Sequence, residues 1–135
     1  MARLMKKSVF GHHSLTPYFT VQHADDFIIF VSRVFNATVF KDSRHADGTL
    51  QHARLLIEDS VIMLNEACDD YPPNMSQMHL YVSDSDQTYE CALQHGATSL
   101  MAPMMRPHGD RMAGFCDPFG NIWWVAERRG EKRSS

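Results

Sequence analysis

Residues 117–127 read Asp-Pro-Phe-Gly-Asn-Ile-Trp-Trp-Val-Ala-Glu, a turn that leads directly into a strand-like run. Proline, glycine and asparagine are typical of tight turns, and the apolar residues that follow indicate a buried strand. Neighbouring side chains of a strand point to opposite faces. We therefore expect Trp123 to pack in the core between sheet and helix, and Trp124 to lie on the other face of the same sheet.

The chain has 135 residues, a length that suits one domain with its own core. Its basic residues gather at both ends, so residues 15–126 hold only 6 of the 13 basic groups but 14 of the 16 acidic groups. The resulting net charge of −8 (6 − 14) argues against a nucleic-acid partner, because phosphate binding requires clustered lysine and arginine. We expect flexible tails at residues 1–14 and 128–135 around a single domain at 15–127.

Composition also limits the cellular setting. No segment approaches the ~20 apolar residues of a membrane-spanning helix, and no secretory signal is recognisable. Cys68, Cys91 and Cys116 are odd in number and form no CxxC pair, so neither a zinc knuckle nor a thioredoxin-type centre is expected. We expect reduced, buried thiols in a cytoplasmic protein that has no membrane partner.

The two halves of the chain repeat each other. Residues 59–64 (Asp-Ser-Val-Ile-Met-Leu) align with residues 120–125 (Gly-Asn-Ile-Trp-Trp-Val) at an offset of 61 (120 − 59). Phe19-Thr20-Val21 and Leu80-Tyr81-Val82 likewise precede similar helical stretches. Each half reads strand, helix and three strands, which gives modules at about 15–70 and 75–127. Paired prolines in Tyr71-Pro72-Pro73-Asn74 mark the boundary, because they end regular structure.

Local signals place the elements. Helices are expected at residues 25–35, where apolar residues recur at helical spacing, and at 86–95, which Gly96 closes. A turn at Asp47-Gly48 separates two strand-like runs. Strands are expected at residues 15–21, 51–57, 60–64, 75–83, 98–105, 111–116 and 121–127.

These features resemble the vicinal-oxygen-chelate superfamily of glyoxalases, bleomycin-resistance proteins and dioxygenases. The likeness covers residues 15–127 and includes Gly109-Asp110-Arg111-Met112 ahead of Asp117-Pro118-Phe119-Gly120. The His52-Ala53 pair, the run from Tyr81 to Asp84 and the two tryptophans resemble its PhnB-like branch most. The resemblance implies an α+β fold, in which two βαβββ modules form a curved mixed β-sheet cup with helices on the convex side. It also implies a homodimer.

Strand alternation predicts which residues line the cup. One phase of the strands is uniformly apolar and should face the helices, whereas the other mixes polar with aromatic groups. Such a mixture suits a pocket for a small molecule, although a half-solvated sheet face is the plainer alternative. With Arg111 added as an anchor, the residues expected to bind ligand are Thr16, Tyr18, Arg54, Met63, Gln77, His79, Arg111 and Trp124.

The resemblance also permits a test for metal. Metal-dependent members of the superfamily carry His and Glu ligands on the first, fourth, fifth and eighth strands. The corresponding positions of this sequence hold Thr16, Met63, Gln77 and Trp124. A shift of two residues in the fifth strand would replace Gln77 with His79, but one imidazole cannot hold the ion. We therefore expect no metal and no other cofactor, which disfavours glyoxalase I and iron dioxygenase chemistry.

Three functions stay open. The favoured one is a metal-independent protein that binds a small organic molecule in a cup between the modules, with Trp124 stacking on it. The second is a lyase, isomerase or dioxygenase-type enzyme with His52 as general base and Arg111 as substrate anchor. The third is an assembly protein with a vestigial cup.

Each candidate residue also has a structural alternative. His52 could instead bond to a neighbouring strand, and Arg111 could pair with Asp110 or Asp117. The charge of the ligand is equally open. The acidic body favours a cation, whereas Arg54 and Arg111 favour an anion.

Overall fold

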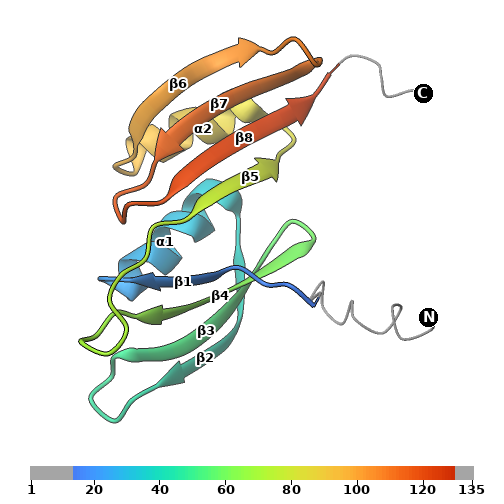
Figure 1. Cartoon of the computed structure of the whole chain (residues 1–135). Coiled ribbons are helices and arrows are strands. Elements are labelled where there is room, and N and C mark those ends of the chain that lie inside the picture. Colours follow the sequence, from blue (N-terminus) through green and yellow to red (C-terminus); the bar gives the residue numbers. More distant parts are fainter. Residues whose placement is uncertain (1–13, 130–135) are drawn as a thin grey trace, which may run out of the picture. The chain divides into compact units, whose positions relative to one another are not determined.

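The computed structural model describes residues 14–129, which divide after Asn74 into two units. Each unit contains one helix and one four-stranded mixed sheet (Figure 1), which confirms the predicted α+β fold. The division falls at the predicted Pro-Pro boundary. Within the described residues, no helix is long and apolar enough to cross a membrane. The tails predicted at 1–14 and 128–135 lie almost entirely outside the described residues.

The first unit follows the order strand, helix, three strands. Its elements are β1 (Tyr18–Val21), α1 (Ala24–Phe35), β2 (Thr38–Arg44), β3 (Leu50–Ile57) and β4 (Ser60–Glu66). The sheet order is β1-β4-β3-β2, with β1 parallel to β4 and the other pairs antiparallel. α1 lies against one face of this sheet (Figure 1). The residues that pack between them are apolar and fully buried: Phe19, Val21, Phe27, Val31, Leu55 and Leu64.

The second unit repeats this arrangement. Its elements are β5 (Gln77–Tyr81), α2 (Ser85–Gln94), β6 (Thr98–Met105), β7 (Asp110–Cys116) and β8 (Ile122–Arg128). The sheet order is β5-β8-β7-β6, with β5 parallel to β8. β8 extends to Arg128, one residue into the segment that we expected to be a tail.

The register of the strands confirms the internal repeat. In the first unit Phe19 lies opposite Leu64, and in the second unit Leu80 lies opposite Val125. Each residue of the second pair stands 61 positions after its counterpart (80 − 19 and 125 − 64). The same parallel pairing has therefore formed twice from two similar stretches of sequence.

A glutamate at the end of each last strand caps the helix of its own unit. Glu66 Oε1 accepts a hydrogen bond from the backbone N–H of Ala24 at 2.8 Å, and Glu127 Oε1 accepts one from Ser85 at 2.7 Å. The first N–H groups of a helix have no partner within the helix, and they carry partial positive charge. These carboxylates therefore fasten the start of each helix to the adjacent strand.

Three expectations differ from the structure. β1 begins at Tyr18 rather than at residue 15, since Pro17 has no N–H to donate and Leu15 is solvent-exposed. β5 spans Gln77–Tyr81, shorter than the predicted 75–83. Of the three thiols expected to be buried, Cys68 is exposed and Cys91 and Cys116 are half-buried.

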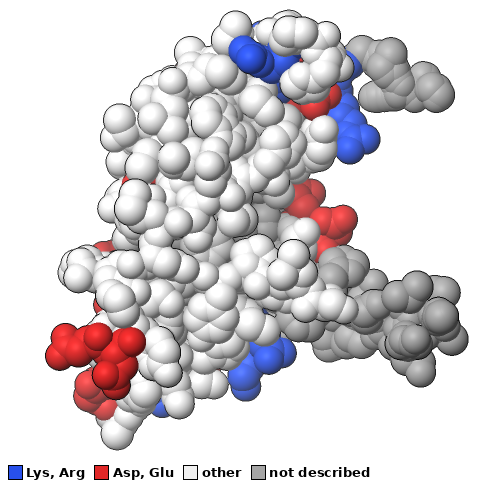
Figure 2. Space-filling model, in the orientation of Figure 1, with Lys and Arg blue, Asp and Glu red and all other residues white. Residues whose placement is uncertain are grey.

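The charged side chains form small separate groups in the view of Figure 2, and uncharged surface predominates between them. Net charge alone is therefore a poor guide to the field at any one site.

Candidate functional site

In each unit one face of the sheet packs against the helix, and we call the opposite face the helix-free face. Tyr18, Met63 and Arg54 are register partners in the first unit, as are His79, Trp124 and Gly114 in the second. These rows alternate with rows of buried residues such as Phe19, Leu64 and Ala53. Alternation predicted this division into two faces. Thr16 lies just before β1 and is half-buried.

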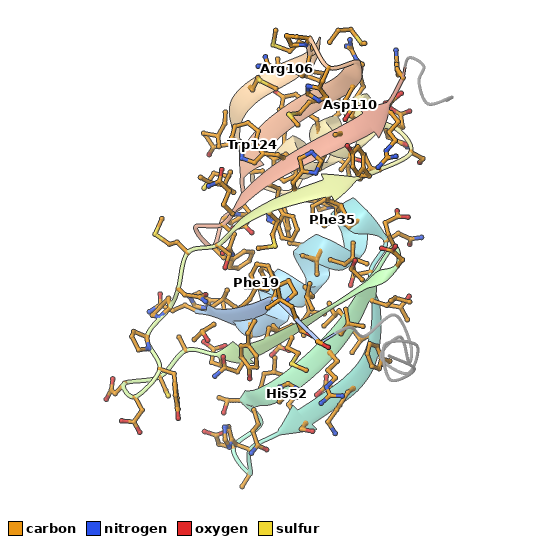
Figure 3. The ribbon with its side chains drawn as sticks, turned by 45° about the vertical axis from the view of Figure 1, so that its right-hand side comes forward. Phe19, Phe35, His52, Arg106, Asp110 and Trp124 are labelled. Carbon is orange, nitrogen blue, oxygen red and sulfur yellow. The ribbon has the colours of Figure 1, made fainter. Side chains whose placement is uncertain are left out.

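The two tryptophans occupy the two faces of β8. Trp123 is 3% exposed and its indole N–H donates to Asp117 Oδ2 at 2.8 Å, which confirms its predicted place in the core. Trp124 is half-buried on the helix-free face, where Figure 3 labels it. Its ring lies directly over Gly114, so close that a Cβ at that glycine would overlap the six-membered ring of the indole. Its indole N–H donates to Gln77 Oε1 at 2.6 Å.

Aromatic and charged groups continue along the helix-free face of the second sheet. The rings of His79 and Tyr81 meet edge to face with centroids 4.9 Å apart. The Tyr81 hydroxyl donates to Asp110 Oδ2 at 3.0 Å, and the Arg128 guanidinium lies 4.1 Å above the Tyr81 ring. Asp110 and Arg128 were absent from the predicted site. Asp110 belongs to the turn motif and Arg128 was expected to be in a tail, so no local signal pointed to this role.

A hydrogen-bonded chain crosses the helix-free face of the first sheet. His52 Nδ1 lies 3.2 Å from the Tyr18 hydroxyl, and Arg54 Nε lies 3.3 Å from His52 Nε2. A guanidinium can only donate, so Nε2 is the acceptor and we infer that the neutral ring carries its proton on Nδ1. His52 then donates to Tyr18. His52 is labelled in Figure 3.

This geometry does not favour the general base expected at His52. The lone pair that would take a substrate proton is already engaged by Arg54 Nε–H. Burial, followed by the charges of Arg54 and Lys41, lowers the pKa of His52 below its usual value. His52 is therefore neutral near pH 7 and is held as a link between Arg54 and Tyr18.

A groove of about 850 Å³ opens at the end of the first sheet where β1 and β4 finish. This volume lies within the range of small-molecule sites. The lining residues include Tyr18, Thr20, Leu50, Asn65, Cys68 and Tyr71. Only Tyr18 is among the ligand-binding residues predicted from the sequence, because most of the others come from strand ends and turns.

Arg111 does not lie on the helix-free face. It shares its phase in β7 with the buried residues Ala113 and Phe115, on the side that packs against α2. Its guanidinium binds Asp86 through two hydrogen bonds, of 2.6 Å and 3.1 Å, and holds the pKa of that carboxyl below its usual value. This corrects our expectation of a ligand anchor. An ion pair was the stated alternative, but its partner is Asp86 in α2 rather than Asp110 or Asp117.

The side chains at the superfamily's metal positions do not fit a divalent ion. Thr16, Met63 and Trp124 offer no imidazole, carboxylate or thiolate, and Trp124 occupies the amide oxygen of Gln77. Among the described residues, one group of three carboxylates could offer ligand atoms, Asp84, Asp86 and Glu127. Arg111 pairs with Asp86 and Arg129 pairs with Glu127, so the negative charge of these two carboxylates is largely neutralised.

The βαβββ repeat and the mixed sheets define a class of proteins, and comparison with known proteins agrees. Residues 11–125 match the sequence profile of the Glyoxalase/Bleomycin resistance protein/Dioxygenase superfamily, and the chain belongs to this superfamily. An uncharacterized protein of Mycobacterium bovis is 32% identical over 128 residues, which cover 84% of this chain and 82% of the relative.

Two solved structures share the fold at low sequence identity. PA1353 from Pseudomonas aeruginosa has a TM-score of 0.72 at 18% identity, and the match covers 86% of this chain and 98% of the other. The PhnB protein from Bacillus cereus, described as a putative 3-demethylubiquinone-9 3-methyltransferase, has a TM-score of 0.68 at 16% identity. That match covers 85% of this chain and 99% of the other.

Proposed function

We propose that this protein binds a small organic molecule without a metal ion, and that Trp124 is the platform on which the molecule stacks. The observation that carries the proposal is the support of the Trp124 ring from below by Gly114 and from the side by Gln77. A ring held in this way loses little freedom when a ligand binds, so more of the contact energy contributes to affinity.

The surroundings of Trp124 suit such a ligand. Aromatic rings pack best against flat or apolar groups, and an offset ring pair contributes about 0.5–1.5 kcal/mol beyond the area that it buries. His79 and Tyr81 provide polar edges on the same face. We propose in addition that the chain belongs to the PhnB-like branch and is a cytoplasmic homodimer.

The test is calorimetric titration of the purified protein with matched aromatic and cyclohexyl compounds. Saturable binding of aromatic members is expected, and Trp124→Ala should weaken it about 10-fold, since 1.4 kcal/mol corresponds to a factor of ten. Trp124→Phe keeps an aromatic ring and should retain most of the affinity. Equal affinity of Trp124→Ala and the unaltered protein would exclude the stacking role.

A further inference from the structure

We propose that the helix-free face of the first sheet is an anion subsite, where Arg54, Lys41 and Tyr18 bind a carboxylate, phosphate or phosphonate group. The inference goes beyond the proposed function, because it assigns a separate subsite within the first unit and names the chemical class of group that it binds. The residues of this subsite all lie in the first unit, so it does not depend on Trp124.

Two basic residues stand directly opposite each other on neighbouring strands. Lys41 of β2 is the register partner of Arg54 of β3, and Arg54 is in turn the partner of Met63. Like charges at directly opposed positions of a sheet destabilise it. Both positive charges act on His52: after burial, the charges of Arg54 and Lys41 lower the pKa of that residue. A bound anion would offset the repulsion between the two cations.

No carboxylate neutralises this pair within residues 14–129. Carboxylate partners are bound by Arg44, Arg111 and Arg129. The nearest acidic residue in β2, Asp42, is bound by Arg44, and Glu66 caps α1. The guanidinium of Arg54 has one hydrogen bond, from Nε to His52, and its Nη1 and Nη2 groups have no acceptor among the described residues.

The hydrogen-bonded chain also frees a third donor. Arg54 donates to His52 Nε2, so His52 donates through Nδ1 to the oxygen of Tyr18. The Tyr18 O–H is then available to another acceptor. Burial raises the pKa of Tyr18 above its usual value, which keeps the phenol protonated. The remaining guanidinium fork and this hydroxyl are both donors, and a planar fork fits the two oxygens of a carboxylate or phosphate.

The net negative charge of residues 15–126 is compatible with an anion subsite. Charges separated by more than about 8 Å are largely screened at physiological salt, so the nearest residues determine the local field. In the first unit those on this face are Lys41 and Arg54. Besides Asp42 and Glu66, the acidic residues of the described part of this unit lie outside its strands, in α1 (Asp25, Asp26), in the β2–β3 turn (Asp47), in the β3–β4 turn (Glu58, Asp59) and after β4 (Asp69, Asp70).

The experiment is an NMR titration of the isotope-labelled full chain with inorganic phosphate, phenylphosphonate and, as a neutral match, benzyl alcohol. Phosphate and phenylphosphonate should shift the Arg54 Nε–H and His52 ring signals saturably, and benzyl alcohol should not. Arg54→Gln should raise the Kd at least about 10-fold, because hydrogen bonds to charged groups are among the strongest in proteins. Arg54→Lys keeps the charge and should have an intermediate Kd.

Arg33→Gln is the matched control, because it removes one positive charge from α1 on the other side of the sheet. It should leave the Kd unchanged, and the amide spectrum of each variant reports whether it is folded. The inference is overturned if neither anion shifts these signals, or if Arg33→Gln weakens binding as much as Arg54→Gln. Trp124-dependent binding of aromatic compounds, with no saturable shift of the Arg54 and His52 signals by either anion, would overturn this inference alone. Phosphate binding at Arg54 without any Trp124-dependent ligand would overturn the proposed function alone.

Discussion

At the scale of single residues, Gly114 determines where Trp124 can lie. No side chain would fit between the β7 backbone and the indole ring, since a Cβ would overlap ring carbons. The glycine is therefore required for space rather than for an unusual backbone conformation, because no left-handed φ is found at this position. The hydrogen bond to Gln77 then fixes the rotation of the ring.

Gly114→Ala should lower the free energy of unfolding by about 1–3 kcal/mol, the usual cost of inserting a methyl group into a filled space. Urea denaturation measures the change. In the double variant Gly114→Ala/Trp124→Ala the added methyl group no longer meets the indole ring. The double variant should therefore lose less unfolding free energy than the two single variants lose in sum. Strict additivity would show that the ring does not rest on Gly114.

A second residue-scale prediction concerns Asp117, which is 4% exposed. Its carboxylate accepts hydrogen bonds from the backbone N–H groups of Phe119 and Asn121 and from the Trp123 indole. Asp117→Ala removes the acceptor that these three hydrogen bonds share, and a buried donor that loses its acceptor costs about 1–3 kcal/mol. We expect a loss of at least about 3 kcal/mol in urea denaturation. Asp69→Ala, in an exposed loop, should change stability by less than about 0.5 kcal/mol.

At the scale of elements, the structure joins the last strand of each unit to its helix through a glutamate. Glu66 and Glu127 stand 61 residues apart (127 − 66) and accept N–H groups from the first turns of α1 and α2. The repeat is evident in the sequence but this capping role is not, because each glutamate lies 42 residues from the N–H that it caps. No local capping pattern reveals so distant a partner.

The Glu127→Gln variant tests the cap, and its effect on stability should depend on pH. Burial alone would raise the pKa of Glu127, but hydrogen bonds from Ser85 and Arg129 outweigh it and hold that pKa below its usual value. The stabilisation is therefore present above the unfolded pKa of about 4.3 and is lost as pH falls through the folded value. Glu127→Gln should cost about 1 kcal/mol at pH 7, and the cost should be smaller at pH 3.

The measurement is urea denaturation of the unaltered protein and the Glu127→Gln variant at both pH values. Glu90→Gln is the control, since Glu90 is an exposed residue of α2 outside its first turn, and should have no effect at either pH. An equal cost of Glu127→Gln at pH 7 and pH 3 would contradict an ionised cap.

At the scale of the whole molecule, one fold occurs twice with different chemistry on its helix-free faces. Tyr18 pairs with Met63 in the first unit, and the equivalent positions of the second unit hold His79 and Trp124. The buried pairs at the next register, by contrast, are apolar in both units. The repeat has therefore kept the core pattern while the opposite faces have diverged.

The donor groups at the superfamily's metal positions lead to a prediction for the whole protein. Purified protein should contain no stoichiometric zinc, nickel or iron by elemental analysis. Treatment with EDTA should leave the Tm unchanged, because a ligand that binds only the folded state would raise it. One tightly bound metal ion per chain would contradict the metal-free proposal.

The sequence by itself determined the α+β class, the repeat, the boundary near Pro72-Pro73 and the burial of Trp123. These features depend on hydrophobic periodicity and turn residues, which act over a few positions of the chain. The tertiary structure alone revealed the ion pair between Arg111 and Asp86, the glycine beneath Trp124 and the chain from Arg54 through His52 to Tyr18. Most of these contacts join strands and helices distant in sequence, so they depend on strand register and packing that no local pattern contains.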